Sequence, residues 1–446
     1  MKVTPTGWAG GPPTSPRRSP RRRQVRLPAT LLISDGVVPV KRAGQPSSLR
    51  PMARAEEGDV VSARSARSLA AAGGIMRFLM QPRDLEHPEA CDLLAGNPLA
   101  LAPSAYVSAV QRAVVPDSPA YYRYGPPWRP AIEAVTTALG GRLGLDLVPD
   151  DVFLTRGASS GLHLLMRTLI DPGDQVLMMS PPWFFYEAMV LAESAEPLKV
   201  DLTEGAFDLD LPAIERAITP RTRAVIVNTP HNPSGRIYPE DQLRGLAEIL
   251  ERASARNRRR VYLLSDEAYA RILFDGREMI TPARFYPATF VLHSYSKTLL
   301  APSQRAGYLA MPPAMPEREH LRRALMLGSI SAGAVPDTAM QHAMPELEGQ
   351  IIDLPAVEWR RDRMVAAMRG QGYSVETPEA GFYLFPRSPI PDAIEFCGWL
   401  DERRVYTLPG EAFERPGHFR ISLTATDAMV ERALPVLGEA IRSFSA

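Results

Sequence analysis

A single lysine, Lys297, follows an apolar run that is typical of a buried strand, Ala288-Thr-Phe-Val-Leu292. Ser294 and Ser296 precede the lysine, and Arg305 follows it eight residues later. An aqueous lysine amine has a pKa of about 10.4, so it becomes nucleophilic at neutral pH only after desolvation or conversion to an imine. The stretch therefore has two interpretations. It is either an imine anchor beside a phosphate clamp, or a solvated loop with a surface arginine.

An earlier strand-like run ends in a turn of small residues. Val152-Phe-Leu-Thr155 leads through Gly157 into Ala158 and Ser159, where a helical pattern begins. A helix start presents backbone N–H groups and the positive end of the helix dipole, which together bind phosphate. We therefore expect phosphate contacts from the Ala158 and Ser159 amides and from the Ser159 hydroxyl. The alternative is that the small residues only let the helix pack against the strand.

Two further strand-like runs carry polar residues at their carboxyl ends. The run 224–228 leads to the turn Asn232-Pro-Ser-Gly235. The run 262–266 ends in Asp266, with Tyr269 shortly after it. A carboxylate at a buried strand end is unfavourable unless it meets a cation. Successive strand residues point to opposite faces, so we expect Asp266 to face the site and Glu267 to point away.

The order of these motifs resembles the class I and II aminotransferases, which are fold-type I enzymes that use pyridoxal 5′-phosphate. The likeness covers residues 77–446 and rests on motifs in the family's order: the small-residue turn, an aromatic residue after Pro181-Pro182, Asn232-Pro-Ser-Gly, Asp266-Glu-Ala-Tyr, Ser294-Tyr-Ser-Lys and Phe419-Arg-Ile-Ser. It implies an α/β fold. A large domain would hold a doubly wound, mostly parallel sheet, and a smaller domain would be α+β.

The resemblance implies a role for each motif residue. Lys297 would form a Schiff base with pyridoxal phosphate and later move the proton between carbon atoms. Asp266 would pair with the ring nitrogen, and Trp183 would stack on the ring. The other cofactor contacts within the chain would come from Ala158, Ser159, Asn232, Tyr269, Ser294, Ser296 and Arg305. Arg420 would bind the substrate's α-carboxylate, with the backbone at Gly96 and the side chain of Asn232 nearby. No metal site is predicted.

The segment around Tyr124 departs from the family's pattern. A tyrosine at this position in the family reaches the cofactor phosphate of the partner subunit, which implies a homodimer with shared active sites. The usual glycine and Leu-Arg pair are replaced by Trp128-Arg-Pro-Ala-Ile. Trp128 can line the mouth of the substrate site or pack against the following helix. The family's substrate specificity is therefore not carried over to this chain.

Charge divides the chain unevenly. Residues 1–75 hold 13 lysines and arginines against 4 acidic residues, and they are rich in proline and serine. This composition predicts a disordered extension. It has three interpretations: a basic arm for nucleic acid, a transit peptide, or an over-long start with Met52 or Met76 as the true beginning. The remaining boundaries predict a segment 76–105 that joins the small domain, a large cofactor-binding domain 106–312 and a small domain 313–446.

The composition also limits location and partners. The two cysteines, Cys91 and Cys397, have no metal-ligand spacing, and a reducing, cytoplasmic location is expected. No run approaches about 18 uninterrupted apolar residues, so no membrane span is expected. Some fold relatives are transcriptional regulators, but residues 1–75 lack the periodic pattern of a helix-turn-helix, so no nucleic-acid partner is expected.

The resemblance implies transfer of an α-amino group between an amino acid and a 2-oxo acid through a Lys297 Schiff base. An alternative keeps the cofactor and changes the fate of the carbanion. Relatives that resemble aminocyclopropane-carboxylate synthase use the same electron sink for elimination, replacement or cyclisation, for example on S-adenosylmethionine. The substrate's side chain is not indicated by the sequence.

Overall fold

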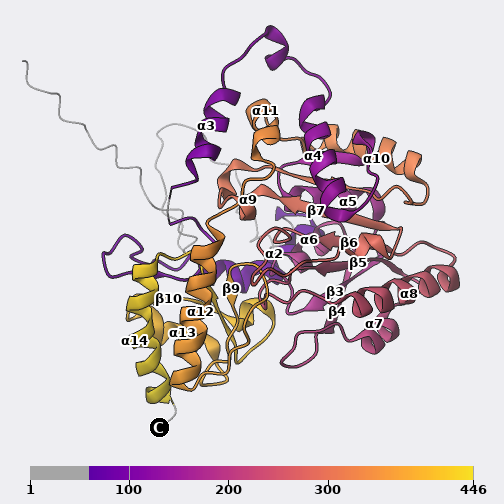
Figure 1. Ribbon diagram of the computed structural model, residues 1–446. Coiled ribbons are helices and arrows are strands. Elements are labelled where there is room, and N and C mark those ends of the chain that lie inside the picture. The colour runs from indigo at the N-terminus through magenta and orange to yellow at the C-terminus, as the bar shows by residue number, and fades with distance from the viewer. Residues whose placement is uncertain (1–59, 100, 445–446) are drawn as a thin grey trace, which may run out of the picture. The chain divides into compact units, whose positions relative to one another are not determined.

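The computed structural model describes residues 60–99 and 101–444. The predictions for residues 1–59 lie outside this range. Seven strands form one sheet in the order β2-β8-β7-β6-β5-β3-β4 (Figure 1). They are β2 (Val152–Thr155), β3 (Gln175–Ser180), β4 (Glu196–Asp201), β5 (Thr222–Asn228), β6 (Tyr262–Asp266), β7 (Thr289–Ser294) and β8 (Gly307–Ala310). All neighbours are parallel except β8, which runs antiparallel to β2 and β7. The predicted mostly parallel sheet is confirmed.

Helices cover both faces of this sheet, as the alternation within β7 shows. Phe290 and Leu292 pack in one hydrophobic core with residues of α5 and α8, whereas Val291 packs in a second core with residues of α4 and α11. The helices connected with the sheet are α3 (Ser104–Ala113), α4 (Arg129–Leu143), α5 (Ala158–Leu169), α6 (Tyr186–Ala192), α7 (Leu211–Ala217), α8 (Glu240–Asn257), α9 (Tyr295–Thr298), α10 (Arg318–Ser331) and α11 (Thr338–Leu347). The doubly wound architecture is thereby confirmed.

Two smaller sheets involve the C-terminal part of the chain. In one, β1 (Cys91–Asp92) pairs in parallel with β10 (Val405–Tyr406). In the other, β12 (Phe419–Ser422) lies between β9 (Tyr383–Leu384) and β11 (Leu408–Pro409), antiparallel to both. The accompanying helices are α12 (Leu354–Gln371), α13 (Ala393–Asp401) and α14 (Asp427–Phe444). Short 3-10 helices occur at η1 (Pro119–Tyr122), η2 (Pro149–Asp151), η3 (Pro282–Arg284), η4 (Pro302–Gln304) and η5 (Gly410–Phe413).

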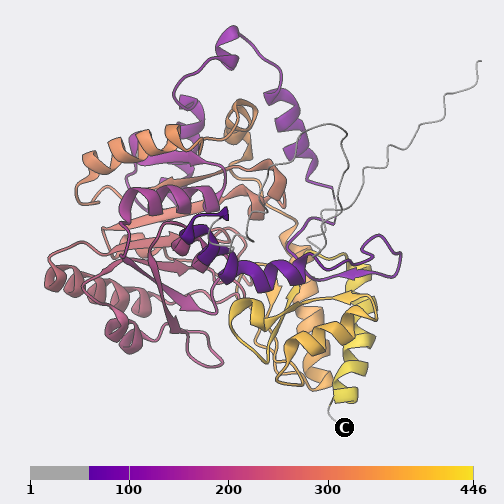
Figure 2. The same ribbon diagram turned by 180° about the vertical axis from the view of Figure 1, so that it is seen from behind.

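The segment before Met76 contains a helix that was not predicted. Helix α2 (Ala63–Leu79) packs against α6, and its buried residues include Ile75 and Phe78 (Figure 2). These two residues lie three positions apart, so they share one helix face. The prediction of disorder is therefore wrong for residues 63–75. None of the described helices is both long and apolar enough to cross a membrane.

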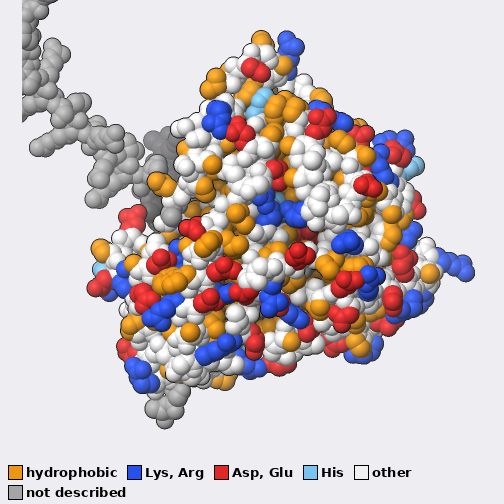
Figure 3. Space-filling view, in the orientation of Figure 1, with side chains coloured by type: hydrophobic (Ala, Val, Ile, Leu, Met, Phe, Trp, Pro, Cys, Tyr) orange, Lys and Arg blue, Asp and Glu red, His pale blue; other side chains and the backbone are white. Residues whose placement is uncertain are grey.

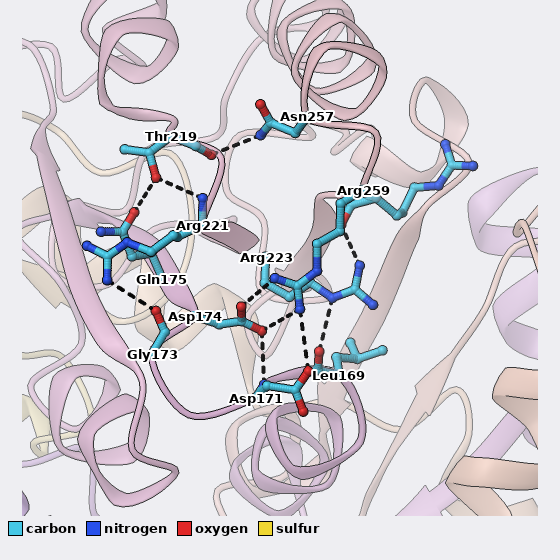
Figure 4. Close-up of polar contacts among 11 residues, drawn as sticks. Leu169, Asp171, Gly173, Asp174, Gln175, Thr219, Arg221, Arg223, Asn257 and Arg259 are labelled. Carbon is cyan, nitrogen blue, oxygen red and sulfur yellow. Dashed lines mark hydrogen bonds and ion pairs between the residues drawn. The ribbon is translucent and has the colours of Figure 1, made fainter.

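Polar contacts fix the amino ends of β3 and β5, as Figure 4 shows. Arg259 binds the Asp174 carboxylate, with Nη2 2.7 Å from Oδ2, just before β3 begins. Arg223, near the start of β5, donates from Nε to the carbonyl of Leu169 at 3.0 Å. Because β3, β5, β6 and β7 are parallel, their carboxyl ends lie together at the opposite edge of the sheet.

Candidate active site

A cavity of about 180 Å³ lies at the carboxyl ends of the parallel strands. It is lined by Ala158, Ser159, Trp183, Tyr186, Asn228, Asn232, Asp266, Ala268, Tyr269, Ser294, Ser296, Lys297, Pro302 and Arg305. Ten of these residues are the cofactor contacts expected within the chain, so the structure brings all ten together. Three other expected site residues, Gly96, Tyr124 and Arg420, are not part of this lining.

One end of the cavity is a cradle for an anion. Arg305 donates to Ser296 Oγ at 3.0 Å and to the carbonyls of Pro302 and Arg156, so these bonds leave its positive charge unneutralised. Gly157 has a φ of 80°, and a Cβ there would lie 2.8 Å from Arg305 Nη2. A side chain at this position is thus excluded. Ser159 stands in the first turn of α5, where backbone N–H groups are unpaired and favour an anion.

A buried acid also lines the cavity. Asp266 ends β6, and its Oδ2 accepts a hydrogen bond from Tyr186 Oη at 2.6 Å. Its Oδ1 accepts from the Ala268 amide at 3.3 Å. Burial raises the pKa of Asp266, while the hydrogen bonds from Tyr186 and Ala268 and the charge of Lys297 oppose that shift. A cationic N–H partner would stabilise the ionised carboxylate in this buried position.

Asn228 holds two parts of the site in place. Its Nδ2 donates to the Asp266 carbonyl at 2.9 Å, and its Oδ1 accepts from the Asn232 amide at 2.7 Å. Neither Asn228 nor Tyr186 was predicted as a site residue. The sequence signal for Asn228 is its position at the end of a strand-like run. In the structure Asn228 lies opposite Asp266 in the pairing of β5 with β6. Tyr186 has no comparable signal, since it follows a run of aromatic residues.

Lys297 reaches the cavity from the short helix α9, which begins directly after β7. The lysine is half-buried, and its Nζ lies 5.8 Å from the centre of the Phe382 ring. Ser294 caps α9 by accepting from the Ser296 amide at 3.3 Å. Tyr269 is buried on another wall, and burial, followed by Tyr383, raises its pKa well above the ordinary value. Its phenol therefore remains a hydrogen-bond donor at neutral pH.

Arg420 lies beside the cavity and is hydrogen-bonded to Asn232, which is part of the lining. Its Nη1 donates to Asn232 Oδ1 at 3.1 Å, and its guanidinium carbon lies 3.9 Å from the centre of the Tyr383 ring. The side chain is buried, and Nε has no hydrogen-bond partner among the described residues. Gly96 is close by, because a Cβ there would lie 2.5 Å from the Tyr383 hydroxyl. Glycine is therefore required at this approach.

Tyr124 and Trp128 lie away from the cavity. Tyr124 is fully exposed at the end of the segment that contains η1. Trp128 stacks on His342 with the ring centres 4.0 Å apart, and its amide donates to Gln341 Oε1 at 2.6 Å. Both partners belong to α11. Of the two interpretations of Trp128, the structure supports packing against neighbouring helices.

The fold and the cavity define an α/β enzyme with an anion cradle, a lysine and a buried acid at one sheet edge. A family model described as "Aminotransferase class I and II" matches residues 89–437. The aspartate/prephenate aminotransferase of Thermus thermophilus is 31% identical over 368 residues, which cover 78% of this chain and 91% of that protein. The aspartate aminotransferase of Geobacillus stearothermophilus is 28% identical over 316 residues, covering 65% of this chain and 76% of that protein.

Solved structures agree with these relatives. An aminotransferase from Eubacterium rectale superimposes with a TM-score of 0.76 at 25% identity, covering 87% of this chain and 97% of that one. The Thermus thermophilus aspartate aminotransferase with maleate gives a TM-score of 0.72 at 27% identity, covering 85% and 99%. The chain belongs to the class I and II aminotransferases. It is a pyridoxal-phosphate-dependent enzyme that transfers an amino group between an amino acid and a 2-oxo acid.

The residues of the cavity fit this cofactor. The unneutralised Arg305 and the space at Gly157 suit a phosphate, and the buried Asp266 carboxylate suits a protonated ring nitrogen. Lys297 places an amine in the same cavity, and an aldehyde can condense with an amine. The relatives named above are aminotransferases, and none of them supports the alternative of elimination, replacement or cyclisation.

Proposed function

We propose that Lys297 is the residue that binds pyridoxal phosphate covalently, and that Arg420 holds the α-carboxylate of the amino acid. The observation that carries the proposal is the meeting of Lys297, Asp266 and Arg305 at one cavity, with Arg420 joined to it through Asn232. Lys297 and Arg305 come from one stretch, whereas Asp266 and Arg420 come from two other segments of the chain. Together they offer one positive charge for the phosphate, one for the α-carboxylate and one acid for the ring.

Pyridoxal phosphate supplies an aldehyde that condenses with amines and a ring that withdraws electrons from the α-carbon of the bound amino acid. Lys297, as a free amine after the substrate's amino group has replaced it, would move the proton from the α-carbon to the adjacent carbon. Asp266 would stabilise the protonated ring nitrogen of the cofactor. Tyr186 and Ala268 orient its two carboxylate oxygens through the bonds described above.

The two polar ends of the site bind the phosphate and the α-carboxylate through positive charge and oriented hydrogen-bond donors. Arg305, Ser159, Ser294 and Ser296 line the phosphate end, and Ala158 adds a backbone amide at the start of α5. Arg420 offers a planar fork that matches a carboxylate, and its Nε is free among the described residues. Asn232 Oδ1 accepts from Arg420 and so aligns the fork with the cavity. The Tyr269 hydroxyl and the Asn232 amide nitrogen would donate hydrogen bonds to the ring's phenolic oxygen.

The assembly we propose is a homodimer with shared active sites, located in the cytoplasm. Exposed apolar residues occur near η1, at Val115, Tyr122 and Tyr124, and on α10, at Leu327 and Ile330. Figure 3 shows hydrophobic side chains around the tip of the molecule that carries η1. Exposed apolar side chains of this size are typical of an interface. The cysteines Cys91 and Cys397 are both free and buried, which suits a reducing compartment.

Borohydride reduction of the holoenzyme, followed by peptide mass spectrometry, tests the anchor. The cofactor should be fixed on the peptide that contains Lys297, and the Lys297→Ala variant should carry no fixed cofactor and lack amino-group transfer. In an assay of amino-group transfer, Arg420→Ala should lower kcat/KM about 100-fold, because the substrate loses a charged hydrogen-bonded partner. The affinity of this variant for the cofactor should stay near wild type.

A matched control is Arg387→Ala, since Arg387 is about half exposed and pairs with Glu204 away from the cavity. This variant should keep the wild-type kcat/KM and the wild-type affinity for the cofactor. Cofactor fixed on another lysine would overturn the assignment of Lys297. An equal loss of cofactor and substrate affinity in Arg420→Ala would remove Arg420 from the substrate site.

A further inference from the structure

His231 is a buried histidine to which the proposed function gives no part. It directly precedes Asn232 in the turn that follows β5, and it is only 4% exposed. Its ring Nε2 lies 3.0 Å from the carbonyl oxygen of Pro181, and its Nδ1 lies 2.7 Å from Ser234 Oγ. Both nitrogens of the ring therefore have a partner inside the protein.

These partners define one form of the ring. A carbonyl oxygen can only accept, so Nε2 carries the hydrogen and donates it to Pro181. Nδ1 is then the acceptor for the Ser234 hydroxyl, whose oxygen accepts in turn from the Arg236 amide at 3.3 Å. Burial lowers the pKa of His231 to about 4, although the bond to Pro181 opposes the shift. The ring is therefore neutral near neutral pH, as this pattern of bonds requires.

The bond to Pro181 joins two separate turns at the cavity. The first turn, residues 181–185, carries Trp183, and the second, residues 229–236, carries Asn232. Both of these side chains line the cavity. Beyond the ladder that pairs β3 with β5, the described residues form no other hydrogen bond between the two turns. The spacing of the turns therefore depends on one imidazole ring.

Each turn presents one side chain that is expected to meet a ligand. Trp183 is the residue expected to stack on the cofactor ring. Asn232 accepts a hydrogen bond from Arg420 Nη1 at 3.1 Å and so adjoins the end of the site that is proposed to bind the α-carboxylate. A shift between the turns changes the distance from the stacking surface to that end. A displacement of about 1 Å at a reacting centre can lower a rate about 100-fold.

We propose that His231 is a positioning residue, whose neutral ring holds the turn of Trp183 at a fixed distance from the turn of Asn232. The ring thereby aligns the surface that stacks on the cofactor with the end that binds the α-carboxylate. His231 acts through these two residues and through its bond to Pro181. The inference rests on the proposed function, because it takes the cofactor and the α-carboxylate as the ligands of the two turns.

Two substitutions of His231 separate its two bonds. The amide nitrogen of a glutamine can take the place of Nε2 and donate to Pro181, whereas the amide of an asparagine takes the place of Nδ1 and bonds only to Ser234. The readout is the pyridoxal phosphate concentration needed for half-maximal borohydride fixation on Lys297. His231→Asn should raise this concentration about tenfold, because the stacking ring is displaced. His231→Gln should stay within about threefold of wild type, because the bond to Pro181 is kept.

A double-mutant cycle separates positioning from a general loss of packing. Trp183→Leu removes the stacking ring, so adding His231→Asn to this variant should change the fixation concentration by less than about twofold. His320→Asn is the matched control, because His320 is exposed on α10, and it should behave as wild type. Far-ultraviolet circular dichroism checks that each variant is folded. If His231→Asn is not folded, His231→Phe takes its place, since it keeps a ring of similar size and loses both bonds.

The outcomes distinguish this inference from the proposed function. Equal effects of His231→Gln and His231→Asn would overturn the inference and leave the proposed function standing. So would an undiminished effect of His231→Asn in the Trp183→Leu variant. Failure of the proposed function would appear in the wild-type protein instead, as cofactor fixed on a lysine other than Lys297.

Discussion

Glu267 is buried next to the site, and one of its carboxylate oxygens is unpaired among the described residues. It follows Asp266 and points away from the cavity, as its place in an extended segment predicts. Its Oε1 accepts hydrogen bonds from Ser265 at 2.9 Å and Thr281 at 2.5 Å, while Oε2 has no partner among the described residues. Burial raises the pKa of Glu267 to about 7, although Thr281 and Arg142 oppose the shift.

This raised pKa predicts how stability depends on pH. Between the ordinary pKa of 4.5 and about 7, the folded protein keeps a proton on Glu267 that the unfolded chain releases. The stability that this group contributes is therefore fully present below about pH 4.5 and is lost as pH rises to about 7. Glu267→Gln removes the titration. The stability of the variant relative to wild type should rise by on the order of 3 kcal/mol across this range.

Urea unfolding at about pH 5 and about pH 8 measures the difference. Glu248→Gln is the matched control, because the Glu248 side chain is 73% exposed and should show the same difference from wild type at both values. A Glu267→Gln variant whose stability relative to wild type does not change with pH would show that Glu267 stays ionised in the folded protein.

At the level of single residues, a motif was enough to bring an expected residue to the cavity. The ten cofactor contacts expected within the chain meet at one cavity because each lies at or within a few residues of a strand or helix end, in a motif of its own. Asn228 and Tyr186 were missed because their partners come from other motifs. The bonds to Asp266 depend on the register of β5 with β6 and on the packing of α6, which no single segment specifies.

Among the elements, helix α2 shows how an average composition conceals a local pattern. The many arginines, prolines and serines of residues 1–75 predict disorder for the whole segment. The structure begins α2 at Ala63, after Ser62, whose side chain accepts from the Ser65 amide. The helix has a small hydrophobic face that is stable only against α6, so its order depends on a contact that the sequence alone does not indicate.

A chain that begins at Met76 should be less stable than one that begins at Met52. The shorter chain loses most of α2, including buried Ile75 and the hydrogen bond from Ser68 Oγ to the Ala188 carbonyl at 2.8 Å. Loss of one large apolar side chain and one such bond corresponds to about 3 kcal/mol. Denaturant unfolding of the two chains measures the difference. Equal unfolding midpoints and slopes would mean that α2 contributes nothing to stability.

For the whole molecule, the fold class was predictable and the order of strands was not. Strand-like runs that alternate with helical patterns predict a parallel sheet. The position of β8 between β2 and β7 depends on pairing Gly307–Ala310 with residues about 150 positions earlier. Pairing over such a separation leaves no local pattern, because both partners are simply apolar runs.

The proposed shared active site is a property of the whole dimer. Tyr124 is fully exposed, and the cavity of its own chain does not include it. If Tyr124 binds the cofactor phosphate of the partner subunit, Tyr124→Phe should raise the cofactor concentration needed for half-maximal fixation on Lys297 about tenfold or more, since one hydrogen bond to a charged group is lost.

A mixed dimer decides whether that bond crosses between subunits. Subunits with Tyr124→Phe keep Lys297, so borohydride fixation reports only on their cavities. Mixing them with an excess of Lys297→Ala subunits, which keep Tyr124, should return fixation to the wild-type cofactor concentration. The matched control is an excess of subunits that carry both substitutions, which should restore nothing. If single and double variants have the same effect, Tyr124 does not act on the partner's cavity, and the exposed ring has another role.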